Sequence, residues 1–146
     1  MRIALASDHA GFAYKERLRQ LLQEAGHEVF DYGAHSEESS DYPDFAVPAA
    51  QAVARGEAEY GILICGSGVG VSIVANKIPG VRAANCCSEE MARLSRQHND
   101  ANVLTFGARL VSFEDAWRMV QVFLSTPFEG GRHARRVEKI HRLTGQ

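Results

Sequence analysis

The 146-residue sequence predicts an α/β fold, a single domain with three layers and a Rossmann-like, five-stranded parallel sheet. Three observations predict it. Short apolar segments typical of strands alternate with segments whose apolar residues recur at helical spacing. The connections between these segments are short, which favours right-handed crossovers and parallel strands. No linker, internal repeat or low-complexity segment interrupts the pattern, so residues 1–146 are expected to form one domain.

The first part of the chain predicts two strands and two helices. Residues 3–6 form a short apolar strand, and the helix after it is expected to end at Gly26, which suits a C-terminal cap. Residues 27–32 predict a second, more exposed strand. After a polar loop, residues 45–55 predict a helix that has Pro48 in its first turn, where proline is tolerated.

The middle of the chain contains the strongest strand signal. Residues 60–65 (YGILIC) are apolar almost throughout, as expected for a strand buried on both faces. They run into the loop GSGVG, which is followed by a helical segment to about Lys77. Residues 81–85 and 103–106 predict the fourth and fifth strands.

Three helices are predicted in the second half from their start signals. Ser88 is a candidate N-cap with two glutamates in the turn that follows it. Ser112 and Asp115 begin a capping-box pattern ahead of an apolar helical face. A basic helix is expected after Gly131.

Composition excludes several classes of protein. The formal net charge of -2 gives no indication of a nucleic-acid or anionic membrane partner. No apolar run reaches the roughly 20 residues of a membrane span, and the N-terminus does not fit a signal peptide. No two of the three cysteines are spaced as a CxxC motif, so neither a zinc site nor a dithiol redox motif is expected. Free thiols and the missing leader favour a cytoplasmic location.

Titratable residues gather near the predicted strand ends. Ligands of parallel α/β sheets bind outside the carboxyl ends of the strands, so we expect these residues to share one rim. They are Asp8 and His9 after the first strand, Cys65 and the GSGVG loop after the third, Cys86 after the fourth, His98, Asn99 and Asp100 just before the fifth, Arg109 after the fifth, and Arg132, His133, Arg135 and Arg136 in the tail.

The GSGVG loop is the most specific local signal. Its glycines allow successive backbone N–H groups to face an oxyanion, and the following helix adds the positive end of its dipole. The dinucleotide pattern GxGxxG fails because position 71 is Val71, and the GK[ST] ending of a Walker loop is absent. An oxyanion site is favoured over a plain structural turn.

Cys65 is the last residue of the strand that precedes this loop. A thiol at the N-terminus of a helix is favoured as thiolate, which can act as a nucleophile or a base. A buried structural cysteine is the alternative that position alone leaves open. A phosphatase loop of the form Cys-x5-Arg is excluded because Val71 occupies the arginine position. Cys86 and Cys87 are interpreted as structural.

The remaining polar residues are ambiguous one by one. His98 lies in the polar stretch RQHNDAN and is either catalytic or a surface histidine. Arg132 and Arg136 are spaced i to i+4, so they can grip a phosphate together or simply form a solvated helix end. Taken as a set with Cys65 and the glycine loop, they provide a base, oxyanion donors and a phosphate clamp. That set suits proton abstraction next to the carbonyl of a phosphorylated sugar.

The chain also resembles a known family, the type B ribose-5-phosphate isomerases and the related galactose-6-phosphate isomerase subunits. The matching motifs cover nearly the whole chain in order. They are SDHAG (7–11), SSDYPDFA (39–46), GILICGSGVGVSIVANKIPGVRAA (61–84), SRQHNDANVLTFGAR (95–109) and FEGGRHARRV (128–137). The resemblance implies interconversion of ribose 5-phosphate and ribulose 5-phosphate, a step of the non-oxidative pentose phosphate pathway.

The resemblance also implies a role for each matching residue. Cys65 would transfer the proton through an enediolate, Ser67 with Gly66, Gly68, Val69 and Gly70 would stabilise the oxyanion, and His98 would open the furanose ring. Asp8 and Asn99 would hold sugar hydroxyls, and His9, Arg109, Arg132 and Arg136 would surround the phosphate. The family works as homodimers or homotetramers whose active sites are shared between subunits. No metal and no organic cofactor is implied.

Two positions depart from patterns within the family. Ser67 replaces a common threonine and keeps the hydroxyl. A branch that uses a glutamate after the glycine loop is excluded, because the chain has Val71 there and retains Cys65. Two alternatives remain at this stage. One is the same reaction on a six-carbon sugar phosphate such as allose or galactose 6-phosphate, and the other is a non-catalytic sensor of phosphorylated ligands.

Overall fold

The computed structural model describes all residues from 1 to 146 and contains one parallel sheet of five strands. The strands are β1 (Arg2–Ser7), β2 (Glu28–Asp31), β3 (Tyr60–Cys65), β4 (Ala83–Asn85) and β5 (Val103–Gly107). Their order across the sheet is β2-β1-β3-β5-β4, and every neighbouring pair is parallel. The predicted α/β class and the five-stranded parallel sheet are confirmed.

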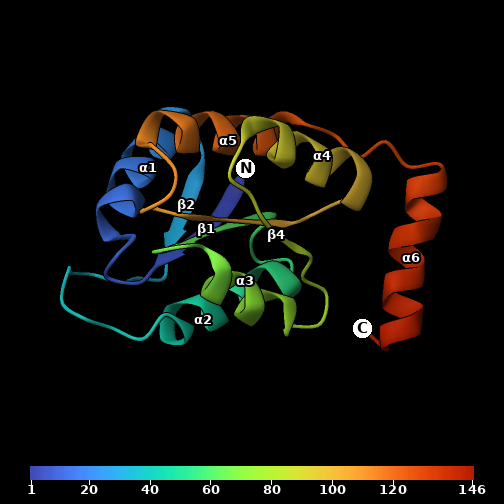
Figure 1. The fold of residues 1–146 in the computed structure, drawn as a ribbon, viewed down its shortest axis with the longest axis horizontal. Coiled ribbons are helices and arrows are strands. Elements are labelled where there is room, and N and C mark those ends of the chain that lie inside the picture. Colours follow the sequence, from blue (N-terminus) through green and yellow to red (C-terminus); the bar gives the residue numbers. More distant parts are fainter.

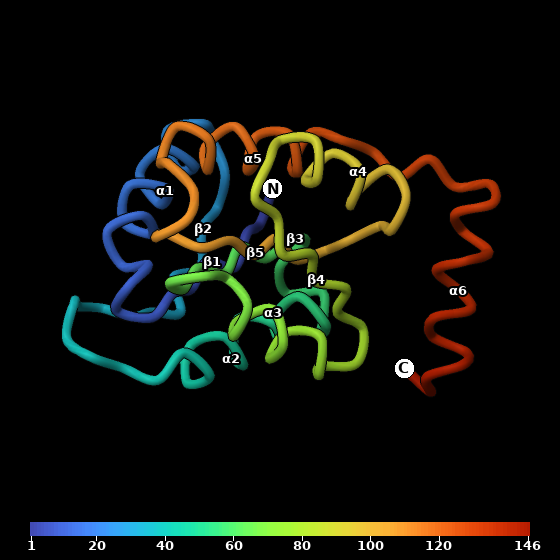
Figure 2. The backbone as a smooth tube through the Cα atoms, in the orientation of Figure 1, coloured from blue at the N-terminus to red at the C-terminus, as the bar shows by residue number.

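Helices cover both faces of this sheet, which gives the three layers seen in Figure 1. The helices are α1 (Phe12–Glu24), α2 (Pro43–Ala54), α3 (Val69–Asn76), α4 (Glu89–Asn99), α5 (Phe113–Ser125) and α6 (Arg132–Thr144). One face carries α1, α4 and α5, and the other carries α2 and α3. Helix α6 stands beside α4 at one end of the molecule (Figures 1 and 2). None of the six combines the length and apolar character that crossing a membrane requires.

The central strand β3 shows how the two cores are built. Successive side chains of a strand point to opposite faces, so Ile62 and Ile64 join the core beneath α1, α4 and α5. Leu63 and Cys65 join the core beneath α2 and α3. Both sets are buried, which explains why this segment reads as a continuous apolar run. The same alternation directs Cys65 toward α3.

The predicted helix caps at Ser88 and Ser112 are confirmed. The Ser88 hydroxyl accepts a hydrogen bond from the N–H of Met91, and the Ser112 hydroxyl accepts one from the N–H of Asp115. Each bond satisfies one of the N–H groups that a helix start leaves unpaired. These local signals therefore fix where α4 and α5 begin.

Two predicted boundaries are wrong. Helix α2 begins at Pro43, a favoured first position for proline, so Pro48 lies inside the helix and not in its first turn. Strand β4 begins at Ala83 and not at Val81. The reason is that the backbone N–H of Arg82 donates to the side-chain oxygen of Asn102 at 2.8 Å, outside the strand ladder.

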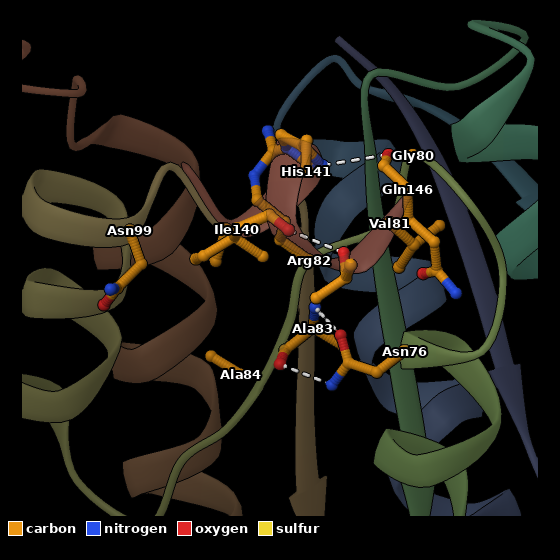
Figure 3. Close-up of a pocket in the computed structure, with 12 residues that line it drawn as sticks. Asn76, Gly80, Val81, Arg82, Ala83, Ala84, Asn99, Ile140, His141 and Gln146 are labelled. Atoms are coloured by element: carbon orange, nitrogen blue, oxygen red, sulfur yellow. Dashed lines mark hydrogen bonds between the residues drawn. The ribbon is translucent and has the colours of Figure 1, made fainter. Parts of the chain in front are cut away.

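The free edge of β4 is closed by a side chain. Figure 3 shows the amide of Asn76 facing Ala83, the β4 residue whose backbone points away from β5. The N–H of Ala83 donates to Oδ1 of Asn76 at 2.8 Å, and Nδ2 of Asn76 donates to the Ala83 carbonyl at 3.0 Å. This pair reproduces the hydrogen bonds that a further strand would form.

Candidate active site

An open pocket of about 540 Å³ lies at the carboxyl ends of β1, β3 and β5. Its lining residues are Asp8, Tyr42, Cys65, Gly66, Ser67, Val69, Gly70, Ile73, Arg109 and Leu110. Seven of the residues predicted from the sequence to act or bind at the glycine loop and the neighbouring strand ends are among them. The structure therefore brings the expected base, the expected oxyanion loop and one expected cation into a single pocket.

Cys65 occupies the centre of this arrangement. Its thiol is 5% exposed and sits at the start of α3. The backbone N–H of Gly68 donates a hydrogen bond to its sulfur, with a distance of 3.2 Å between N and Sγ. The sulfur therefore faces a backbone N–H donor and the positive end of the α3 dipole.

The glycine loop is shaped by close approach of its neighbours. Gly68 has a φ of +82°, and a Cβ atom there would lie 2.6 Å from the backbone carbonyl carbon of Phe106. A Cβ atom on Gly70 would lie 2.7 Å from the ring of Tyr42. Position 68 therefore requires glycine, whereas a side chain at position 70 would have to displace the Tyr42 ring, which packs directly over the loop. Tyr42 was not singled out from the sequence, although it lies in the motif SSDYPDFA.

Several backbone donors of the loop have no partner within the chain. The N–H of Gly68 is bonded to Cys65, and the N–H of Val69 donates to the Ser67 hydroxyl oxygen at 3.2 Å. The N–H groups of Gly66, Ser67 and Gly70 make no hydrogen bond to any other atom of the protein. Unpaired donors beside a thiol are what an oxyanion site needs.

Asp8 and His9 are fixed in place just after β1. Oδ1 of Asp8 accepts hydrogen bonds from the N–H groups of Ala10 at 3.0 Å and Gly11 at 3.2 Å. His9 makes two bonds of 3.1 Å to Ser40, in which its N–H donates to the hydroxyl and its Nδ1 accepts from the backbone N–H. Because Nδ1 accepts, the Nε2 of a neutral His9 carries the proton and can donate to an anion.

Arg109 provides an exposed cation at the same rim. Its backbone N–H donates to the carbonyl of Gly66 at 3.1 Å, and a Cβ atom on Gly66 would lie 3.0 Å from Nη1 of Arg109. The guanidinium therefore lies over the glycine loop. It forms no salt bridge with any carboxylate of the chain, which leaves its charge available to a ligand.

Four predicted site residues lie elsewhere, and the expectation of one shared rim is wrong. His98 and Asn99 end helix α4, which leads into the start of β5, so they lie at the amino edge of the sheet. Arg132 and Arg136 belong to α6, which packs against α4 (Figure 1). Strand β5 runs from this amino edge to Gly107, which is paired with Cys65. Its four residue steps span about 13 Å, so roughly the length of the strand separates this group from the thiol.

Asn99 lines a second pocket, of about 520 Å³, between β4 and the end of α6 (Figure 3). Arg82 crosses this region, with its Nε donating to the carbonyl of Asp100 at 2.9 Å and its Nη1 3.2 Å from Nε2 of His141. These contacts tie α6 to the sheet. The pocket contains no cysteine and no member of the glycine loop, so it is distinct from the Cys65 pocket within one chain.

His133, which the sequence placed among the titratable residues of the tail without a specific role, lies in the same region. Its ring stacks on that of His98, with centroids 4.2 Å apart and an angle of 8° between planes. Burial and the nearby charges of His98 and Arg132 lower the pKa of His133 below its usual value, and Glu129 opposes them. His133 is therefore neutral near pH 7. Its spacing of four residues from Glu129 was the available signal.

The other two cysteines fit the structural interpretation. Cys86 is 3% exposed, and its burial raises the pKa of its thiol to about 11. A thiol with such a pKa stays protonated at neutral pH and is a poor nucleophile. Cys87 is exposed and lies outside both pockets.

The carboxyl-edge pocket defines a class of protein. A buried thiol held at the start of a helix, beside unpaired N–H donors and a free guanidinium, suits an α/β enzyme that shifts a proton on a small anionic substrate. Comparison with known proteins then gives the family. The chain belongs to the ribose/galactose isomerase family, whose sequence model matches residues 3–140, and the resemblance inferred from the motifs is confirmed.

Individual relatives agree with this assignment. Ribose-5-phosphate isomerase B of Escherichia coli is 52% identical over 139 residues, which cover 95% of this chain and 93% of the relative. The structure of Clostridium thermocellum ribose-5-phosphate isomerase B is 49% identical, with a TM-score of 0.97 over 99% of this chain and 98% of the other. Ribose-5-phosphate isomerase B of Mycoplasma genitalium, solved with ribulose 5-phosphate bound, is 43% identical, with a TM-score of 0.95 over 99% and 97% of the two chains.

Proposed function

We propose that this chain interconverts ribose 5-phosphate and ribulose 5-phosphate, with Cys65 moving one proton between the first two carbons of the open-chain sugar. The observation that carries the proposal is the pocket in which a buried thiol lies beside unpaired N–H donors. Further support comes from the Escherichia coli relative, which bears the name of this activity, and from the Mycoplasma genitalium structure, which holds ribulose 5-phosphate.

The proposed reaction begins at the thiolate of Cys65. The sulfur takes the proton from C2 of the aldose, and the electron pair moves onto the oxygen of the C1 carbonyl to give an enediolate. The same thiol then returns the proton to C1, a proton passes from the C2 oxygen to the C1 oxygen, and C2 becomes the ketone. No electrons enter or leave the sugar, so the proposed steps require no redox cofactor, and the residues named here supply the base and the oxyanion donors.

The glycine loop would stabilise the charge that develops on the sugar oxygen. The N–H groups of Gly66, Ser67 and Gly70 are unpaired, and two or more of them can donate to an oxyanion. The Ser67 oxygen already accepts from the N–H of Val69, which leaves its hydroxyl proton free to donate as well. Each preorganised donor of this kind contributes roughly 10²–10³-fold in rate, comparable to the base itself.

His98 and Asn99 would act on the sugar bound beside Cys65 of a second copy of the chain. Within one chain they lie at the opposite edge of the sheet from the thiol. A homodimer or homotetramer would place the amino edge of one copy against the carboxyl edge of another and complete two equal sites. In such a site His98 would move the proton that opens the furanose ring, and Asn99 and Asp8 would hold hydroxyl groups.

The phosphate would be held by cations from both copies. His9 and Arg109 stand at the carboxyl edge, while Arg132 and Arg136 come from α6. Neither Arg132 nor Arg136 is paired with a carboxylate in the chain, and both are exposed. Guanidinium groups bind phosphate oxygens through paired hydrogen bonds, so three of them with one imidazole suit a dianionic phosphate.

The setting of this activity follows from the same features. Each chain would supply one isomerase domain, and the assembly would work in the cytoplasm, where free thiols such as Cys65 remain reduced. We propose no nucleic-acid or membrane partner. A six-carbon sugar phosphate is the second candidate substrate, because the family description includes galactose and the pocket is open.

The test is conversion of ribose 5-phosphate by the purified protein in EDTA, beside Cys65→Ala and the control Cys87→Ala. We expect the Cys65 variant to lose at least about 10²-fold in kcat with little change in KM, because a base acts mainly in the transition state. The control removes an exposed thiol outside the pocket and should turn over normally. Near-normal turnover by Cys65→Ala would remove Cys65 as the base, and conversion of allose 6-phosphate alone would favour the second candidate.

A further inference from the structure

Three side chains at the end of α4 have the composition of a metal site. His98 lies in the last turn of α4, Glu129 in the link to α6, and His133 in the first turn of α6. Their donor atoms all lie within 4.8 Å of one another. Oε1 of Glu129 is 3.8 Å from Nε2 of His98 and 3.6 Å from Nε2 of His133. Two imidazole nitrogens and one carboxylate oxygen form a known ligand set of zinc, with a fourth position open.

The fold holds the three residues together independently of any ligand. The backbone N–H of Glu129 donates to the carbonyl of Gln97 at 3.1 Å, which ties the link to α4. His133 is 7% exposed, and its backbone N–H donates to the carbonyl of Gly130 at 3.1 Å. Its ring is further fixed by stacking on His98. The cluster is therefore partly preorganised, with one anchored ligand and two exposed ones.

We propose that His98, Glu129 and His133 form a reversible binding site for a divalent transition metal such as zinc, and that a metal bound there removes His98 from catalysis. Tetrahedral zinc with bonds of about 2.0–2.1 Å places its ligand atoms about 3.3 Å apart. The two distances from Glu129 need to shorten by about 0.5 Å or less to reach that value.

One ring must turn to complete the geometry. The two imidazoles are nearly parallel and stacked, so their lone pairs lie in two separate planes and cannot both meet one metal as they stand. The His98 side chain is 39% exposed, and the terminal torsion of histidine is soft, so His98 is the ring that rotates. His133 is held by its surroundings and stays in place.

The charges around the cluster explain why the site would be reversible. Two cations of α6, Arg132 and Arg136, repel a metal ion, and Glu129 offsets only one of those charges. The balance favours a moderate-affinity inhibitory site over a permanent structural one.

The binding test is a titration of the full-length protein with Co²⁺, whose visible absorption reports tetrahedral coordination. We expect one saturable site per chain, an affinity more than tenfold weaker in Glu129→Gln, and a similar loss in His98→Asn. His35→Asn is the matched control, because it removes an exposed histidine in a distant loop and should bind normally. No saturable band, or equal binding by Glu129→Gln and the wild type, would overturn the site.

The inhibition arm rests on the proposed function, whereas the Co²⁺ titration does not. Zn²⁺ should inhibit turnover of ribose 5-phosphate by the wild type, EDTA should reverse it, and Glu129→Gln should keep its turnover at the same Zn²⁺ concentration. Equal inhibition of Glu129→Gln would point to the Cys65 thiol and overturn the inhibitory role. If the protein isomerised no sugar phosphate, the proposed function would fail while the titration still decided the metal site.

Discussion

Mixing two inactive variants should restore turnover if each active site is built from two copies of the chain. Cys65→Ala damages the half-site at the carboxyl edge of the sheet, and His98→Asn damages the half-site at the amino edge. Each variant alone forms only damaged sites. A dimer with one copy of each has one site that carries both changes and one site that is intact, because the second site takes Cys65 and His98 from the chains that retain them.

The expected recovery follows by counting. Random pairing of equal amounts makes about half of all dimers mixed, and half of the sites in a mixed dimer are intact. About a quarter of the wild-type turnover should therefore return. The subunits are exchanged by co-expression with two affinity tags, and initial rates are measured on ribose 5-phosphate.

A matched control uses two lesions in the same half-site. Cys65→Ala mixed with Cys65→Ser leaves no intact site in any dimer, so its rate should stay at the level of the separate variants. If Cys65 and His98 acted within one chain, each site of a mixed dimer would keep one lesion. Failure to recover turnover, with mixed dimers demonstrated by their tags, would refute the shared site.

Three further outcomes follow from single positions. Gly68→Ala should lower the free energy of unfolding in denaturant by roughly 1–3 kcal/mol and abolish turnover, because φ is +82° and the new Cβ would lie 2.6 Å from the β5 backbone. An unchanged free energy of unfolding would contradict this close approach. Asp31→Asn should cost about 3 kcal/mol, since it leaves the fully buried ammonium of Lys15 with only the more distant carboxylate of Glu16, at 3.8 Å, and an unchanged Tm would show that the Lys15–Asp31 pair is dispensable. Mass spectrometry after iodoacetamide treatment at pH 7 should find Cys87 alkylated and Cys86 intact, with Cys86 reacting only as pH nears its raised pKa of about 11; early modification of Cys86 would contradict its burial.

The sequence predicted best where one local cause decides the structure. Strand β3 was placed to the residue, since a segment buried on both faces must be apolar throughout. The caps at Ser88 and Ser112 were placed because a hydroxyl that satisfies helix N–H groups acts within three residues. Such signals do not depend on contacts with distant parts of the chain.

Boundaries that depend on competing partners were missed. Pro48 suggested the first turn of a helix, but Pro43 offered an earlier start, and local pattern does not rank the two. The start of β4 was misplaced because the N–H of Arg82 donates to the side chain of Asn102, which is 20 residues away in the sequence. A long-range hydrogen bond of this kind has no periodic signature.

The sequence predicted which residues belong to the candidate site better than it predicted where those residues lie. The pocket at Cys65 followed from strand ends, because most of its residues come just after a strand or on the glycine loop, whereas Tyr42 lies at the N-cap of α2 and Ile73 lies within α3. His98 was assigned to the same rim because it is close to β5 in sequence. It precedes that strand, however, and therefore lies at the opposite edge. The stacking of His133 on His98 depends on the packing of α6 against α4, which no local sequence pattern shows.

The amide of Asn76 has a consequence for how copies of the chain can join. Because it occupies both outward backbone groups of Ala83, the first residue of β4 is not available to pair with a foreign strand. This shortens an already short edge and works against a continuous intermolecular sheet, the arrangement found in fibrils, at this border. Asn76 thus protects the start of the β4 edge from self-association through the backbone.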